Sequence, residues 1–211
     1  EYPYAQEMNR KSKYSVSELK HESMVEKYDR AEGAVVVPEF LLEERESYVP
    51  DFARKVTHAG MHGQGVNHGA LRGTAVHRVM ECMDFAAFTE VDSASQKEVQ
   101  KFIAKELERM VPALLSEEQR ELINPDKLLK FFISPIARRM AEADKRGNLF
   151  REKPFVMDYE GALLQGIIDV FWLEGDKIIL LDYKTDSVST EKELVDRYSR
   201  QLELYADALC R

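Results

Sequence analysis

Two aspartates and a lysine, Asp169, Asp182 and Lys184, lie within or directly after a segment of the sequence that predicts a β-hairpin. Its two apolar, β-prone stretches, 163–173 and 177–181, are separated by a Gly-Asp pair typical of a two-residue turn. So short a turn fixes the register, and pairing outward from the turn places Asp169 directly opposite Asp182. Because side chains alternate between the faces of a strand, Lys184 shares the face of Asp182.

Carboxylates placed opposite each other on a sheet repel. A hard divalent cation with oxygen ligands would remove that repulsion, so the hairpin predicts a metal site with a neighbouring ammonium group. The alternative is a solvated hairpin on which the aspartates and the lysine form ordinary surface ion pairs. The hairpin alone leaves both interpretations open.

Composition and charge narrow the classes of protein. The 211 residues suit one domain, or one domain with an additional helical lobe. The net charge of -8 argues against a free-standing domain that binds DNA tightly, unless another domain supplies the positively charged surface for DNA. No apolar run approaches the roughly 18 residues of a membrane span, and the start does not resemble a signal peptide, so a cytoplasmic protein without membrane contact is expected. The start without Met and the helical end indicate a segment of a longer protein.

Two kinds of cofactor are not expected. Cys82 and Cys210 are too few for a four-thiolate cluster, which argues against an iron–sulfur cluster. The phosphate-loop pattern Gly-x-x-x-x-Gly-Lys-Ser/Thr is absent from the sequence, so this chain is not expected to bind ATP.

The elements around the hairpin predict an α/β fold with a small mixed β-sheet flanked by helices and a largely helical N-terminal half. A glycine-rich loop is expected over 58–73, followed by a helix with Thr74 as its N-cap. Ser15 or Ser17 caps a short helix after an extended piece. The remaining expected elements are a helix over 96–110, a capping box at Ser116, a helical pattern over 126–145 broken at Pro135, a strand over 150–155 and a helix over 191–209.

Several segments, taken in order, resemble one nuclease family. Asp169 followed by Asp182-Tyr183-Lys184 resembles the Asp...(Asp/Glu)-x-Lys signature of restriction-endonuclease-like enzymes. The further matching segments are Tyr14–Leu19, Gly73–His77, Arg151–Phe155 and Tyr198–Tyr205. Together they resemble the RecB-type branch of the PD-(D/E)xK nucleases, and within it the C-terminal nuclease domain of AddA-type helicase-nuclease subunits.

The resemblance implies a role for each residue that matches the signature. Asp169 and Asp182 would be metal carboxylates, the backbone carbonyl of Tyr183 would be a further ligand, and His77 would complete the site from its helix. Lys184 would orient the attacking water and offset charge on the phosphate. One or two divalent ions, Mg²⁺ or Mn²⁺, are expected in this site. A histidine ligand would favour Mn²⁺, because imidazole suits Mn²⁺ better than Mg²⁺.

Four other residues receive roles from the same resemblance. Glu152 would act through a water in the metal shell, or would pair with a neighbouring Arg or Lys. Gln201 would lie near the metal or the scissile phosphate. Tyr205 and Arg200 are candidates for DNA contact, and Tyr205 is equally a candidate core residue.

The implied function is metal-dependent, exonuclease-type hydrolysis of DNA in double-strand-break end processing and recombinational repair. Residues 1–211 would form a single nuclease domain, with 1–72 as a helical and loop segment within it. Its partners would be DNA, the helicase domains of the same full-length chain and a second helicase-nuclease subunit. Two alternatives stay open: a nuclease-like scaffold that has lost catalysis, and a metal-dependent hydrolase of small phosphorylated molecules.

Overall fold

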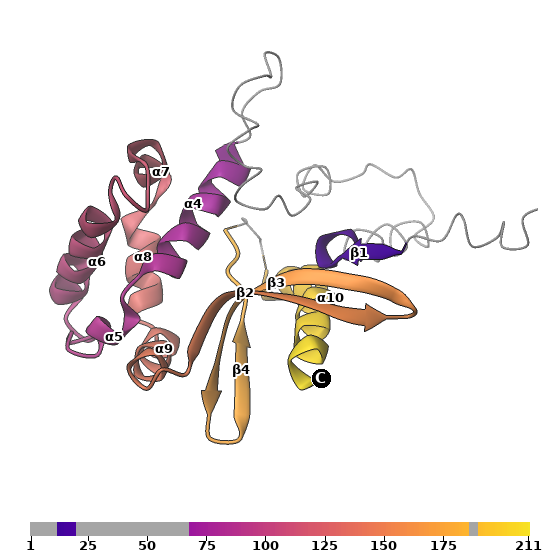
Figure 1. Ribbon diagram of the computed structural model, residues 1–211. Helices are drawn as coiled ribbons and strands as arrows, with labels where there is room; N and C mark the ends of the chain where they lie inside the picture. Colours follow the sequence, from indigo (N-terminus) through magenta and orange to yellow (C-terminus); the bar gives the residue numbers. More distant parts are fainter. Residues whose placement is uncertain (1–11, 20–67, 186–189) are drawn as a thin grey trace, which may run out of the picture. The chain divides into compact units, whose positions relative to one another are not determined.

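The computed structural model describes residues 12–19, 68–185 and 190–211 (Figure 1). The described residues group into two compact units. One holds 12–19, 154–167 and 190–211, and the other holds 68–153 and 168–185. Most of the segment 1–72, including 58–67 of the expected loop, lies outside the described residues.

A mixed β-sheet with helices beside it confirms the expected fold class. The described strands have the order β1-β3-β2, and β4 also pairs with β3. β1 (Lys13–Ser15) runs parallel to β3 (Ala162–Glu174), whereas β4 (Lys177–Leu181) runs antiparallel to it. β2 (Leu149–Tyr159) is longer than the expected strand, because the pattern continues to the turn before β3.

The hairpin of β3 and β4 has the expected register. Glu174 pairs with Lys177, and the ladder continues to Val170 opposite Leu181. Gly175 has a φ of 58°, the only positive φ of the two turn residues, which is the pattern of a type II′ turn. The chain leaves the ladder at Leu181, so Asp182 lies one residue beyond the end of β4.

Six helices make up the helical part of the second unit (Figure 1). They are α4 (His68–Cys82), α5 (Phe85–Phe88), α6 (Gln96–Met110), α7 (Glu117–Leu122), α8 (Pro125–Phe132) and α9 (Pro135–Lys145). The bounds of α6, the capping box of Ser116 with Gln119 and the break before Pro135 are confirmed. Each follows from local rules of capping and proline placement.

The expected start of the helix carrying His77 was wrong. The helix begins at His68 rather than after Thr74, which is an interior residue of α4. The glycines up to Gly73 predict a loop, but a glycine inside a helix costs only about 1 kcal/mol, and the stretch from 70 to 72 contains strong helix formers. Arg72 also donates a hydrogen bond from Nη2 to the carbonyl of Thr185, which ties this first part of α4 to the end of the hairpin.

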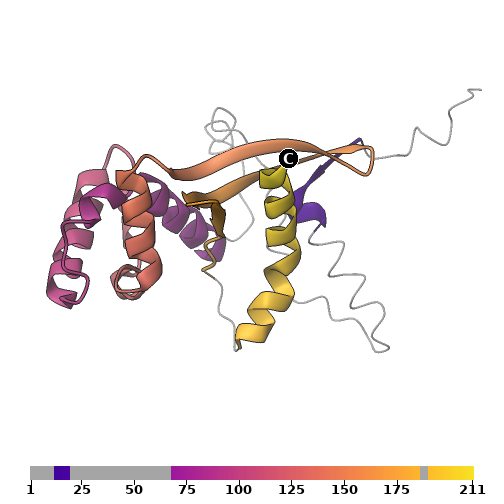
Figure 2. The ribbon, with the colours of Figure 1, turned by 90° about the horizontal axis from the view of Figure 1, so that it is seen from below.

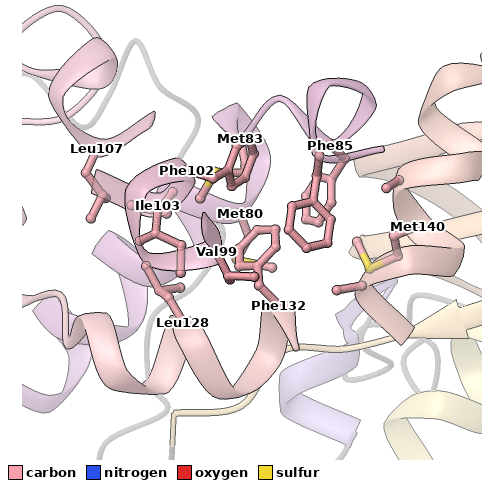
Figure 3. Close-up of a cluster of buried hydrophobic side chains, with 14 of the residues drawn as sticks. Met80, Met83, Phe85, Val99, Phe102, Ile103, Leu107, Leu128, Phe132 and Met140 are labelled. Carbon is pink, nitrogen blue, oxygen red and sulfur yellow. The ribbon is translucent and has the colours of Figure 1, made fainter. Parts of the chain in front are cut away.

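A cluster of buried hydrophobic side chains, several of them aromatic, forms the core of the helical part (Figure 3). Phe132 of α8 packs against Phe85, Phe88 and Phe102 with ring centroids 5.5, 4.9 and 5.6 Å away. Trp172 of β3 is fully buried in the same cluster and joins the sheet to the helices. Burial of each such side chain contributes about 1.5–3 kcal/mol, so this core fixes the place of α4.

The other unit is built around α10 (Glu191–Cys210), which begins at the capping residue Thr190 (Figure 2). The ring of Tyr205 packs edge-on against Phe155 of β2, with centroids 5.8 Å apart. Gly166 of β3 lies so close beneath Phe155 that an added Cβ would meet its ring at 2.7 Å. In the same unit Ser15 is confirmed as the N-cap of the short helix over 16–19, since its Oγ accepts the N–H of Glu18 at 3.2 Å.

Candidate metal and catalytic site

Three side chains from three different elements converge in the second unit. His77 of α4, Glu152 of β2 and Asp169 of β3 each offer a possible ligand atom, and these atoms lie within 4.8 Å of one another. His77 Nδ1 is 3.5 Å from Glu152 Oε1 and 3.7 Å from Asp169 Oδ1. Elements far apart in the sequence therefore assemble one acid-and-imidazole cluster.

The packing of α4 determines the direction of His77. Ala75 and Val79 are fully buried in the aromatic core, which leaves the His77 ring half-buried at the margin of that core. The ring of Tyr183 meets the imidazole edge-on, with centroids 6.0 Å apart and an angle of 86° between the planes. The imidazole is therefore held between an aromatic wall and two carboxylates.

Glu152 adopts a backbone conformation that is rare for a side chain with a Cβ. Its φ is 47°, inside a strand whose regular geometry requires negative values. Such conformations cost about 1–2 kcal/mol and concentrate at functional sites. Its neighbour Arg151 donates to the carbonyl of Met83 at 2.6 Å and pairs with Asp144 at 3.5 Å, so the expected alternative pairing of Glu152 with Arg151 is not observed.

Asp169 is a buried carboxylate, 7% exposed, at the centre of the cluster. Its Oδ2 accepts the backbone N–H of Tyr183 at 2.7 Å. Burial, reinforced by the negative charge of Asp182, raises the pKa of Asp169 to about 7, although His77, Lys184 and the Tyr183 N–H act in the opposite direction. A carboxylate in this position gains from any cation that binds beside it.

His77 responds to the same surroundings. Burial lowers the pKa of the imidazole, but the hydrogen bond to Glu152 and the charges of Asp169 and Glu152 outweigh it, and the net effect is a raised pKa. The cluster therefore favours positive charge at its centre, which is the property of a cation site.

Asp182 and Lys184 form an ion pair next to the cluster. Lys184 Nζ lies 2.8 Å from Asp182 Oδ2, and the two side chains are 21% and 4% exposed. An ion pair between these residues is thus present, but its low exposure differs from the solvated surface pair considered as the alternative. Among the described residues, the close group of possible ligands contains Glu152 and does not contain Asp182, whose charge nevertheless reaches Asp169.

The donor set fits a divalent cation. One imidazole nitrogen and two carboxylate oxygens, one of them from a buried acid with a raised pKa, match the ligand types of Mn²⁺ and also admit Mg²⁺. The sequence predicted only an indirect role for Glu152, whereas the structure places it in the close group and gives it a positive φ, which no sequence pattern indicates.

The predicted residues on α10 belong to the other unit. Gln201 is buried and donates from Nε2 to the hydroxyl of Tyr205 at 2.9 Å, which is consistent with their expected common face. Tyr205 is 5% exposed and packs on Phe155. Arg200 is exposed and donates to the hydroxyl of Tyr159 at 2.7 Å and to Glu203 at 3.2 Å. These contacts give all three residues a structural task within their own unit.

Comparison with known proteins decides the family. A model of the PD-(D/E)XK nuclease superfamily matches residues 52–211, which include every residue of the cluster. This chain belongs to the PD-(D/E)XK nuclease superfamily. The expected resemblance to the PD-(D/E)xK nucleases is thereby confirmed.

Curated relatives extend the similarity to the whole chain. The chain is 38% identical over 156 residues to the A-type subunit of an ATP-dependent helicase/nuclease of Clostridium acetobutylicum, covering 65% of this chain and 12% of that protein. Proteins with the same name from Clostridium perfringens and Alkaliphilus metalliredigens are 31% and 29% identical over 99% and 100% of this chain, which in each case covers 17% of the relative. The chain thus spans less than a fifth of the length of these relatives. Within the described residues, no helix is both long and apolar enough to cross a membrane.

Proposed function

We propose that this member of the nuclease superfamily is a metal-dependent deoxyribonuclease that hydrolyses phosphodiester bonds at DNA ends. The observation that carries the proposal is the convergence of His77, Glu152 and Asp169, with their possible ligand atoms within 4.8 Å of one another. Asp169 is a buried acid with a raised pKa, which favours a functional site over a network of surface ion pairs, since such a network needs no buried acid. The family match supports nuclease chemistry over other uses of such a cluster.

In this proposal His77, Glu152 and Asp169 hold the cation, and Asp182 and the backbone carbonyl of Tyr183 are further ligands. When bound, the cation supplies Lewis-acid charge to the phosphodiester and to the attacking water. The N–H of Tyr183 fixes the orientation of Asp169 through the 2.7 Å hydrogen bond to Oδ2. This bond leaves Oδ1, the atom 3.7 Å from His77 Nδ1, on the side of the imidazole.

Lys184 provides the positive charge for the reaction itself. Its ammonium, held 2.8 Å from Asp182, is available to offset the negative charge that grows on the phosphate and to orient the attacking water. We further propose that Gln201 assists near the scissile phosphate and that Tyr205 and Arg200 contact the DNA backbone. The contacts of these three residues within their own unit leave these roles to be tested.

We propose that the nuclease works in the C-terminal part of a larger helicase-nuclease in the processing of double-strand breaks for recombinational repair. The names of the relatives and their much greater length support this context, and the absence of a phosphate loop from this sequence assigns the ATP motor to other residues. Residues 1–211 would then act as one nuclease domain whose partners are DNA, the helicase domains and a second helicase-nuclease subunit. DNA as the substrate makes the cytoplasm the expected compartment.

The test combines cation binding with cleavage of a linear oligonucleotide by the 211-residue chain. We expect Mn²⁺ or Mg²⁺ to raise the midpoint of thermal unfolding and to support cleavage. Both effects should be lost in Asp169→Asn and retained in the matched control Asp176→Asn, which changes an exposed carboxylate in the turn of the same hairpin.

Three outcomes would contradict the proposal. Cleavage by Asp169→Asn at the rate of the unchanged chain would remove the acid cluster from the reaction. No stabilisation by either cation, together with no cleavage, would favour the catalytically inactive scaffold. Hydrolysis of mononucleotides in preference to oligonucleotides would favour the hydrolase of small phosphorylated molecules.

A further inference from the structure

A cavity of about 310 Å³ adjoins the acid cluster within the same unit. We call it the α4–α8 pocket. Its apolar walls include Val76 and Met80 of α4, Leu128 and Phe131 of α8, and Ile136 of α9. The volume lies at the lower end of the range of about 300–1,000 Å³ found for small-molecule sites.

The pocket and the acid cluster share a wall. Asp182, Tyr183 and Lys184 line the pocket, and they also belong to the predicted active site. The ring of Tyr183 meets His77 edge-on at 6.0 Å and Phe131 edge-on at 6.1 Å. One aromatic side chain therefore separates the imidazole of the cluster from an aromatic side chain of the pocket.

Arg72 is one of several polar residues in the lining of this cavity, and it brings a buried donor. Its Nη2 donates to the carbonyl of Thr185 at 3.4 Å, whereas its Nε is buried and has no hydrogen-bond partner among the described residues. A buried, charged donor without a partner is costly, and the cost exceeds that of a neutral group. Because Nε has almost no accessible surface, a molecule in the cavity would meet Arg72 through the other nitrogens of the guanidinium, and a negatively charged acceptor would make the strongest bond there.

The chemistry of the pocket identifies its occupant. A flat ring system satisfies the aromatic and aliphatic walls, and an anion attached to it satisfies Arg72. At the lining, Asp182 offsets the charge of Lys184 at 2.8 Å, and Lys127 adds a further positive charge that also suits a phosphate group. A nucleotide combines both features, and the neighbouring acid cluster is proposed to act on a phosphodiester.

We infer that the α4–α8 pocket holds the base of the nucleotide that adjoins the cleaved phosphodiester, and that Arg72 binds the phosphate on the other side of that nucleotide. This inference rests on the proposed nuclease function. The base must be unpaired to enter the cavity, since a base inside a duplex is stacked and paired. The pocket would set the position of the strand relative to His77, Glu152 and Asp169.

The experiment uses the 211-residue chain and a single-stranded oligonucleotide, either intact or with one abasic nucleotide at its centre. A gel that resolves every product reports the cleavage rate at each linkage, and fluorescence anisotropy without metal reports binding independently of cleavage. Ile136→Trp fills the pocket, and its matched control is Ile133→Trp, an exposed residue that is not among the lining residues. Arg72→Gln removes the buried donor, and Lys130→Gln removes an exposed positive charge from α8.

We expect the abasic nucleotide to slow cleavage at one of its two adjoining linkages by roughly 5- to 150-fold, the effect of about 1–3 kcal/mol of base stacking. Ile136→Trp should slow cleavage of the intact strand to a similar extent, and the abasic nucleotide should then have no further effect. Ile133→Trp should behave as the unchanged chain does. Arg72→Gln should weaken binding in anisotropy by about tenfold or more, and Lys130→Gln by less.

Two results would overturn the inference. If the unchanged chain cleaves the linkages on both sides of the abasic nucleotide as fast as in the intact strand, the pocket holds no base, although the nuclease function stands. If no linkage is cleaved and neither cation stabilises the chain, the nuclease function fails. Equal anisotropy of the intact and abasic strands would then overturn the pocket as well.

Discussion

Replacement of Asp169 by Asn should make the cation-free protein more stable at neutral and alkaline pH. Asp169 is buried, lies near Asp182 and has a pKa raised to about 7 from an ordinary value of 3.8. Asn has nearly the same shape, can keep an acceptor for the N–H of Tyr183, and carries no charge. The substitution therefore removes the ionisation and leaves the packing in place.

The sign and size of the effect follow from proton linkage. Between about pH 4 and pH 7 the folded chain keeps the proton on Asp169, whereas the unfolded chain has lost it. The stabilisation from this group is complete below about pH 4, declines as the pH rises, and is gone above about pH 7. Roughly three pH units at about 1.4 kcal/mol each give a loss of about 4 kcal/mol. His77, whose pKa is also raised, adds a loss of the same sign.

Urea denaturation in the presence of a chelator, at several pH values from 4 to 8, measures this loss. The free energy of unfolding of the unchanged chain should fall more steeply with pH than that of Asp169→Asn, and the difference between the two curves isolates residue 169 from the other titrating groups. Asp176→Asn should follow the unchanged chain. Parallel curves for Asp169→Asn and the unchanged chain would refute the assignment of a buried, neutral Asp169.

Three further variants test other parts of the site and the fold. Lys184→Ala should lower kcat by about 10²–10³-fold and leave Mn²⁺ affinity intact, and cleavage at the unchanged rate would disprove its electrostatic role. In urea denaturation the free energy of unfolding of Glu152→Gly should exceed that of Glu152→Ala by about 1 kcal/mol, because only glycine adopts a φ of 47° without strain. Equal stability of the two variants would show that the strain is absent. Gly166→Ala should lose about 1–3 kcal/mol because its Cβ would meet Phe155 at 2.7 Å, whereas Gly73→Ala, with 3.7 Å to Thr185, should be tolerated in the same denaturation assay.

Elements with local signals were predictable in detail. The bounds of α6 and the capping box of Ser116 needed only neighbouring residues. The register of the β3–β4 hairpin needed only a two-residue turn and the alternation of the strands. The start of α4 was not predictable in this way, because Gly73 is a weak signal that contacts between Arg72 and Thr185 override.

The candidate site shows the same division. Asp169, Asp182 and Lys184 could be placed together because they lie within or directly after one short hairpin. Glu152 reaches the cluster from β2, where it has a positive φ, and His77 reaches it from α4, which packs against the hydrophobic core. Residue spacing in the sequence therefore does not predict how close Glu152 and His77 come to Asp169.

By itself, the sequence determined the hairpin that carries the two aspartates and the lysine, the helices with clear caps, and the resemblance to a nuclease family. The tertiary structure alone decided which side chains share the cluster, how deeply Asp169 is buried, and that Arg72 lines a pocket next to it. The physical reason is range. Turns, caps and strand alternation act over a few residues, whereas desolvation and the meeting of α4, β2 and β3 depend on the packing of the whole unit.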